Sequence, residues 1–130
     1  MSIEKLLSDE CEELFRPVGK FELELIKDSD YRRFPKRLFH QPIFYPVLNQ
    51  EYAETIASKW NTKDAASGFT GYVTRFKVRR DFLSKYSIQL AGAQAIHQEY
   101  WIPAEDLEDF NDNIVGPIEV IAEFHGEIKS

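Results

Sequence analysis

The chain has 130 residues, 43% of them hydrophobic and 14% aromatic, which is enough to bury one core of ordinary domain size. Its formal net charge of -6 argues against general binding to nucleic acid or to an anionic membrane, because both depend on positive charge. The single cysteine excludes an intramolecular disulfide, and the lack of an apolar run long enough for a signal peptide or a membrane span predicts a cytoplasmic protein.

The N-terminal region combines helical and extended patterns. Apolar residues recur at helical spacing through residues 1–11, which predicts an N-terminal helix with Cys11 as a buried, inert thiol. Residues 14–18 have the composition of a short strand, and Pro17 indicates that this strand lies at a sheet edge. Residues 21–25 alternate as in a strand, yet their Leu and Glu content favours a helix, and we predict a helix there.

The middle of the chain contains the clearest helix signal. A loop over 28–39 and a short apolar strand over 43–47 precede a helix predicted at 49–60. Asn49 is a good N-cap, and an acidic residue follows in the first turn. One apolar stripe, which we expect to face the core, comprises Tyr52, Ala53, Ile56, Ala57 and Trp60.

The second half alternates short strands with short helices. We predict strands at 72–78, 87–90, 96–102 and 118–124, with helices at 80–86 and from Pro103 onward. Without regular βαβ spacing, this order favours an α+β fold. The expected architecture is a single domain over 1–130, with an N-terminal helix at 1–11 and a core at 12–126. Its mixed or antiparallel sheet carries short flanking helices.

The most informative string for chemistry is HQEYWIP at residues 97–103. In a strand, alternate side chains share a face, so His97, Glu99 and Trp101 point the same way. A carboxylate beside an imidazole and an indole can stabilise a cationic transition state or bind a ribose. The alternative is that Glu99 is a solvated strand residue or pairs with an arginine.

This string resembles the glutamate strand of the ADP-ribosyltransferase fold, which often shows the pattern E-x-x-x-P. Glu99 and Pro103 match that spacing. The strand around Arg16 resembles the family's first strand, which carries an arginine or histidine that holds the dinucleotide. The Phe44-Tyr45 pair before the 49–60 helix is similar to an aromatic pair in the family. Three features depart from it: the Ser-Thr-Ser string is missing, His97 stands where many transferases have Glu or Gln, and the chain is shorter than most toxins of this family.

The resemblance implies a cleft for NAD in an enzyme that transfers or hydrolyses ADP-ribose. Glu99 is the implied catalytic residue, bonded to the ribose 2′-hydroxyl and stabilising the oxocarbenium-like state. Arg16 would contact a phosphate or ribose, Tyr45 could stack on the nicotinamide, and His97 and Trp101 complete the cofactor-binding set. The alternatives are a salt bridge for Arg16 and core packing for Tyr45.

Other readings of the sequence concern partners and metals. The alternative is a protein with the same fold but no catalytic activity, for instance an immunity or regulatory protein. Its acidic face at residues 105–112 would then bind a basic protein partner. The partner is therefore either a small-molecule dinucleotide or a protein. Residues 31–40 interleave basic and aromatic side chains, which suits single-stranded nucleic acid or a solvated loop; given the acidic chain we expect no nucleic-acid partner. No histidine pair has ligand spacing, so we expect no metal.

Overall fold

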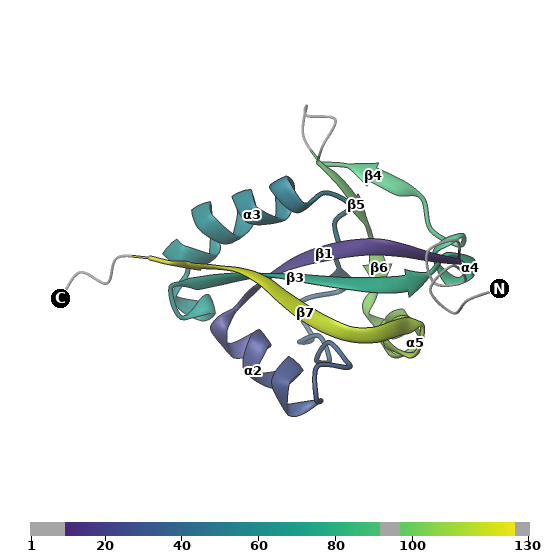
Figure 1. Cartoon of the computed structure of the whole chain (residues 1–130), viewed down its shortest axis with the longest axis horizontal. Coiled ribbons are helices and arrows are strands. Elements are labelled where there is room, and N and C mark those ends of the chain that lie inside the picture. Colours follow the sequence, from purple (N-terminus) through teal and green to yellow (C-terminus); the bar gives the residue numbers. More distant parts are fainter. Residues whose placement is uncertain (1–9, 92–96, 127–130) are drawn as a thin grey trace.

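Three long strands form the centre of the computed structural model, which describes residues 10–91 and 97–126 (Figure 1). They are β1 (Cys11–Gly19), β3 (Thr70–Arg79) and β7 (Ile114–His125). Their order is β1-β3-β7, and both pairings are antiparallel. The predicted strands at 14–18, 72–78 and 118–124 are confirmed, each with wider limits, and β1 is an outer strand of this sheet as Pro17 indicated.

Val47 links the open edge of β1 to β5 by backbone pairing. Val47 forms antiparallel bridges with Phe15 on one side and with Glu99 on the other. Four short strands complete the pairing in two antiparallel ladders, β2–β6 and β4–β5. These strands are β2 (Ile43–Phe44), β4 (Ile88–Leu90), β5 (Gln98–Tyr100) and β6 (Ile102–Pro103). All strand pairing in the described part of the chain is antiparallel, which decides between the mixed and antiparallel expectations.

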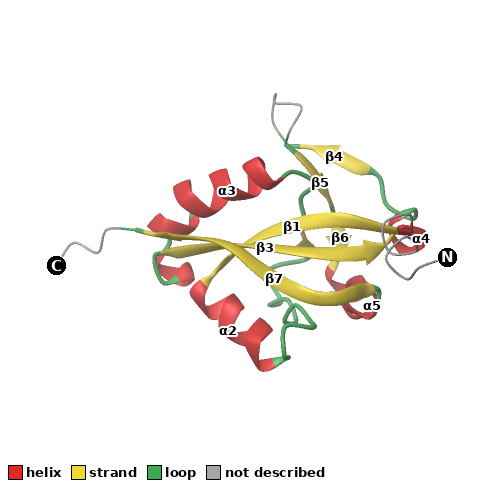
Figure 2. Cartoon of the chain, in the orientation of Figure 1, coloured by secondary structure: helices red, strands yellow, loops and turns green. Residues whose placement is uncertain are grey.

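Short helices flank the strands (Figure 2). The α-helices are α2 (Lys20–Asp28), α3 (Gln50–Lys59), α4 (Arg80–Leu83) and α5 (Leu107–Asp112). Single 3₁₀ turns are η1 (Asn61–Lys63), η2 (Ala65–Ser67) and η3 (Ala104–Asp106). The expectations of an α+β fold and of a helix at 21–25 are confirmed. Asn49 is also confirmed as an N-cap, since its side chain accepts from the backbone N–H of Tyr52 at 3.0 Å.

Helices α2 and α3 cover opposite faces of the β1-β3-β7 sheet. Leu14 and Phe76 are paired in register and pack with Ile26 of α2 in the larger core cluster. Phe15 and Val73 lie in a second cluster with Ala53 and Ala57 of α3. Because successive strand residues point to opposite faces, the two clusters lie on the two sides of the sheet.

Gly71 of β3 sets how closely α3 approaches the sheet. A Cβ atom at this position would overlap the backbone carbonyl of Ala57, which is backbone and cannot rotate away. Only glycine permits this contact, so the height of α3 above β1 and β3 depends on the missing side chain. Helix α3 in turn carries one wall of the pocket described below.

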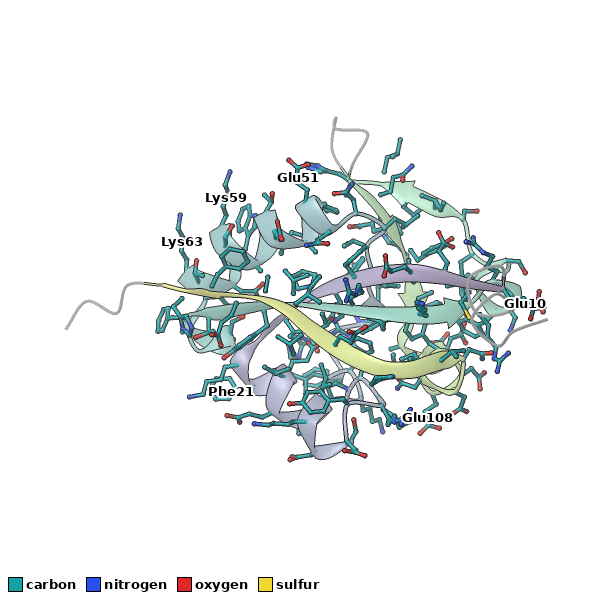
Figure 3. The ribbon with its side chains drawn as sticks, viewed as in Figure 1. Glu10, Phe21, Glu51, Lys59, Lys63 and Glu108 are labelled. Atoms are coloured by element: carbon teal, nitrogen blue, oxygen red, sulfur yellow. The ribbon has the colours of Figure 1, made fainter. Side chains whose placement is uncertain are left out.

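Two expectations about local structure are wrong. β1 begins at Cys11, so the helical spacing predicted through Cys11 gives way to an extended segment paired with Arg79; residues 1–9 lie outside the described part of the chain. Cys11 is nonetheless buried, as expected. Trp60 is 70% exposed, because α3 ends at Lys59 and the chain turns into η1 instead of continuing over the sheet. Figure 3 shows Lys59 and Lys63 extending into solvent from this end of α3.

The predicted strands at 43–47 and 96–102 are each interrupted. The first is regular only at β2, after which Val47 forms isolated bridges. The second is broken at Trp101 between β5 and β6, so its two halves pair with different partners, β4 and β2. Residues 92–96 lie outside the described part. The break leaves the indole of Trp101 46% exposed beside the edge of β1.

Candidate functional site

A pocket of about 410 Å³ lies at the open edge of β1, where that strand faces α3 and the Val47 bridge. Its lining comes from β1, the segment 45–47, α3, η1 and the end of β5. The lining residues are Arg16, Pro17, Tyr45, Val47, Ile56, Asn61, Glu99 and Trp101. Four of the five residues expected from the sequence therefore meet in one pocket, and His97 does not line it.

Glu99 is a buried carboxylate held in place by two donors. Glu99 is only 8% exposed. The indole Nε1 of Trp101 donates to Oε1 at 2.7 Å, and the phenol of Tyr52 donates to Oε2 at 3.1 Å. Each oxygen keeps further acceptor capacity, because a carboxylate offers about four lone-pair directions. The alternative of a solvated strand residue is wrong, and the shared orientation expected for Glu99 and Trp101 is confirmed by their hydrogen bond.

The Glu99 carboxylate contributes to a shift in the pKa of Tyr52. Burial, together with the charge of Glu99 and the hydrogen bond to it, raises the pKa of the Tyr52 phenol to about 12. The phenol therefore stays protonated at neutral pH and acts only as a donor toward Glu99. Tyr52 was expected to face the core as part of the apolar stripe; it is half-buried and packs against the cluster that contains Ala53 and Ala57, and its phenol also fixes the carboxylate.

Arg16 also lines the pocket, but its donors are largely taken. The guanidinium donates from Nε and Nη2 to the two carboxylate oxygens of Glu22, at 2.7 and 2.9 Å. Nη1 donates to the carbonyl oxygen of Tyr45 at 3.3 Å, and the guanidinium carbon lies 4.5 Å from the centroid of the Phe44 ring. The salt-bridge alternative for Arg16 is thus present in the structure, within the wall of the same pocket.

Two aromatic side chains stand at the mouth of the pocket. Tyr45 is 40% exposed and Trp101 is 46% exposed, and their rings meet edge to face with centroids 6.2 Å apart. Core packing, the alternative for Tyr45, is therefore wrong. An exposed aromatic pair beside a buried carboxylate is suited to hold a flat, cationic ring.

His97 lies one step behind the pocket. Its ring stacks on Tyr52 with centroids 4.3 Å apart and an interplanar angle of 19°. Its Nδ1 is 3.1 Å from the carbonyl oxygen of Ala91, a distance at which a protonated Nδ1 donates. His97 thus supports the tyrosine that holds Glu99, and its link to the pocket is indirect.

Sequence reasoning missed Asn61 as a lining residue. Its Nδ2 donates to the Ser67 hydroxyl at 3.0 Å, and that hydroxyl donates to Asp64 at 2.8 Å. Asn61 Oδ1 is buried and has no partner among the residues that the structure describes. The segment 61–68 had only the composition of a polar loop, so nothing in the sequence distinguished Asn61 from its neighbours.

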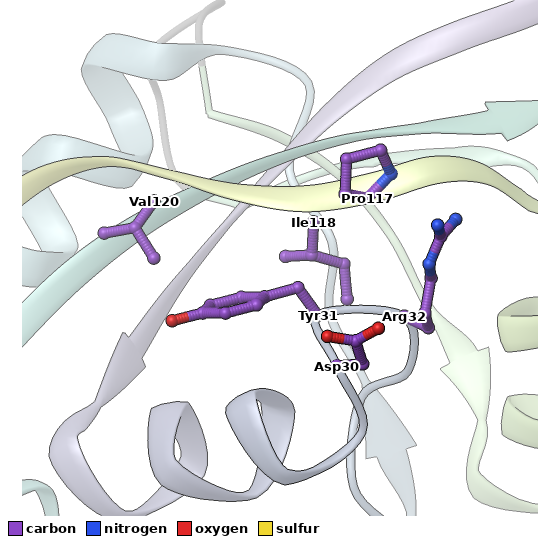
Figure 4. Close-up of a pocket in the computed structure, with 6 residues that line it drawn as sticks. All are labelled: Asp30, Tyr31, Arg32, Pro117, Ile118 and Val120. Carbon is purple, nitrogen blue, oxygen red and sulfur yellow. The ribbon is translucent and has the colours of Figure 1, made fainter.

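A second hollow lies under β7 (Figure 4), with a volume of about 470 Å³. The ring of Tyr31 lies along it below Ile118 and Val120, with Asp30 and Arg32 at the other end. Asp30 and Tyr31 have φ of 61° and 59°, and the Tyr31 carbonyl accepts from the backbone N–H of Ile118 at 2.7 Å. These features tie the turn after α2 to β7, and no buried charged group is positioned there, so the pocket at β1 is the better candidate.

The comparisons and searches add little to this geometry. Models of known protein families, curated proteins and solved structures all give no match to this chain. Within residues 10–91 and 97–126, no group of three or more His, Cys, Asp or Glu side chains is arranged to hold a metal. No helix in the same residues is long and apolar enough to cross a membrane. The candidate function therefore depends on the pocket itself.

Proposed function

We propose that the pocket at the edge of β1 binds the nicotinamide-ribose end of NAD and that the protein transfers or hydrolyses ADP-ribose. The observation that carries this proposal is the Glu99 carboxylate, buried in the pocket wall and fixed at both oxygens by Trp101 and Tyr52. A fixed carboxylate is suited to stabilise positive charge that develops on a ribose. The volume of about 410 Å³ is toward the small end of ligand pockets, which fits part of a dinucleotide better than all of it.

The proposed reaction breaks the bond between ribose C1′ and the nicotinamide nitrogen. The electron pair of that bond passes to the ring nitrogen, which neutralises the pyridinium, and C1′ becomes oxocarbenium-like. Glu99 accepts a hydrogen bond from the ribose 2′-hydroxyl and stabilises this cation, and Tyr45 and Trp101 hold the nicotinamide ring. Water or an acceptor group then bonds to C1′ and loses a proton to solvent.

Binding and chemistry are separated by two variants. Calorimetry with NAD at millimolar concentration is expected to give heat for the wild type and for Glu99→Gln, which keeps the shape of the side chain. Arg16→Ala is expected to bind more weakly, because it removes a charge from the wall and frees Glu22, which is a second negative group near the ligand. No heat for the wild type, together with no rise in its melting temperature, would reject the dinucleotide proposal.

A second candidate is a protein-interaction module without chemistry. The observation in its favour is that Arg16 already donates to Glu22 and to the Tyr45 carbonyl, so its guanidinium is engaged within the pocket wall without a ligand. The acidic face at 105–112 has exposed carboxylates at Glu105, Glu108 and Asp109. A basic protein partner would then bind there, and its affinity would fall steeply with added salt.

A further inference from the structure

Arg37 is a charged group near the candidate site with few hydrogen bonds. It lies in the loop between α2 and β2, where its Nη2 donates to the carbonyl oxygen of Ile43 at 3.0 Å. Its Nε is buried and has no hydrogen-bond partner within residues 10–91 and 97–126. A buried donor without a partner costs free energy, so the folded protein holds this group at a cost that an acceptor would relieve.

Arg16 and Arg37 differ in how many of their guanidinium nitrogens already donate a hydrogen bond. Arg16 uses Nε and Nη2 on Glu22 and Nη1 on the Tyr45 carbonyl, so its fork is occupied on every nitrogen. Arg37 has one nitrogen so engaged, by the Ile43 carbonyl, which is neutral. Of the two arginines, Arg37 is therefore the one that has guanidinium N–H groups available for a ligand.

Two positively charged side chains and one carboxylate lie around the ring of Phe44. The guanidinium carbons of Arg16 and Arg37 lie 4.5 and 5.9 Å from the centroid of its ring, and Glu22 is the carboxylate that pairs with Arg16. Burial lowers the pKa of Arg37 and the charge of Arg16 lowers it further, while Glu22 and then Tyr45 act in the opposite direction. Arginine keeps its proton in proteins, so Arg37 remains a half-buried cation near the cation of Arg16.

We propose that Arg37, beside Arg16, contacts the diphosphate of the ligand whose nicotinamide end occupies the pocket. This inference rests on the proposed function and assigns the direction in which the dinucleotide leaves the pocket, past Tyr45 toward the 36–41 loop. The segment 43–45 joins the two places, since the Ile43 carbonyl accepts from Arg37 and the Tyr45 side chain lines the pocket. A guanidinium fork is well matched to two phosphate oxygens.

The test compares ligands that carry or lack the diphosphate. Calorimetry is run with ADP-ribose, inorganic pyrophosphate and free nicotinamide on the wild type, Arg37→Gln, Arg37→Lys and the control Arg32→Gln. Arg32 is an exposed arginine close by in the sequence, on the hollow under β7. Arg37→Gln is expected to weaken ADP-ribose and pyrophosphate about ten-fold or more and to leave nicotinamide within about two-fold, because only the first two carry phosphate. Arg32→Gln is expected to change none of them beyond about two-fold.

The outcomes separate this inference from the function on which it rests. ADP-ribose binding that is unchanged in Arg37→Gln overturns the role of Arg37 while leaving the pocket intact. Pyrophosphate binding that depends on Arg37 without any nicotinamide or NAD binding supports the anion site and rejects the NAD proposal. If Arg37→Gln melts too low to be assayed, Arg37→Lys decides: it keeps the charge but loses the fork, so weakened ADP-ribose binding supports the role and unchanged binding overturns it.

Discussion

The phenol of Tyr52, on α3, donates a hydrogen bond of 3.1 Å to the carboxylate of Glu99, on β5, from 47 positions away in the chain. This contact joins the helix above the sheet to the strand bridged to Val47, and it fixes one oxygen of Glu99. The other oxygen is fixed by Trp101. The orientation of the central carboxylate therefore depends on two residues whose removal can be measured separately.

Tyr52→Phe removes one of these donors without changing the ring. We expect a loss in the free energy of unfolding of about 1–3 kcal/mol, because the hydrogen bond involves a charged, mostly buried carboxylate. Urea denaturation of the wild type and the variant at neutral pH measures the difference. Tyr45→Phe is the matched control, since the Tyr45 ring is 40% exposed and its loss of a hydroxyl should cost under about 0.5 kcal/mol. Equal stabilities for wild type and Tyr52→Phe would show that the contact is not formed in solution.

The raised tyrosine pKa values predict a loss of stability in alkali. The pKa of Tyr52 and that of Tyr100 are each raised to about 12, in both cases first by burial and then by a neighbouring glutamate. A group whose pKa is raised in the folded state stabilises it fully below the unfolded pKa, near 10, and this stabilisation is lost as pH rises toward 12. The free energy of unfolding should therefore fall between these values, and it should fall less steeply in Tyr52→Phe.

Ultraviolet titration of the phenols checks the same prediction in the folded state. The chain has six tyrosines, and burial raises the pKa of Tyr52, Tyr72, Tyr86 and Tyr100. Most of the phenolate absorbance should thus appear well above the normal tyrosine pKa, or together with unfolding. A single transition of all six near pH 10 would contradict the buried hydrogen bonds that the structure gives these side chains.

Two aromatic residues should differ sharply in their effect on stability. Phe44 is 1% exposed and packs with Phe34 and Phe110, whereas Trp60 is 70% exposed. Phe44→Ala should cost about 3–5 kcal/mol, and Trp60→Ala under about 0.5 kcal/mol. Chemical denaturation of both variants measures the two costs. A large cost for Trp60→Ala would mean that α3 continues over the sheet in solution, as the apolar stripe had indicated.

The sequence predicted the parts of this site that depend on local periodicity. Strand parity placed Glu99 and Trp101 on one side, and the strand composition around Arg16 placed that residue in β1. What it could not show are contacts set by chain turns. The turn from β1 into α2 brings Glu22 onto Arg16, and the end of α3 carries Trp60 away from the core. No spacing rule in the sequence describes either event.

Contacts between residues that are far apart in the sequence could not be predicted from sequence patterns either. Tyr52 had the spacing of a core residue, and its contact with Glu99 depends on the long-range pairing in which Val47 bridges β1 and β5. Arg37 belonged to a basic, aromatic segment with two possible readings. Phe34 of that segment is buried and Phe39 is fully exposed, so the loop is divided between core and solvent.

The proposed role of the Glu99 carboxylate in cleaving NAD in the pocket at β1 is tested most directly by the release of free nicotinamide. The rate is measured for the wild type, for Glu99→Gln and for Glu105→Gln, an exposed glutamate outside this pocket. We expect Glu99→Gln to lower the rate by at least about 100-fold with NAD affinity nearly unchanged, because the charge acts mainly in the transition state. Glu105→Gln should release nicotinamide at the wild-type rate. Equal rates for wild type and Glu99→Gln, or no release by the wild type with any acceptor or water, would contradict the claim.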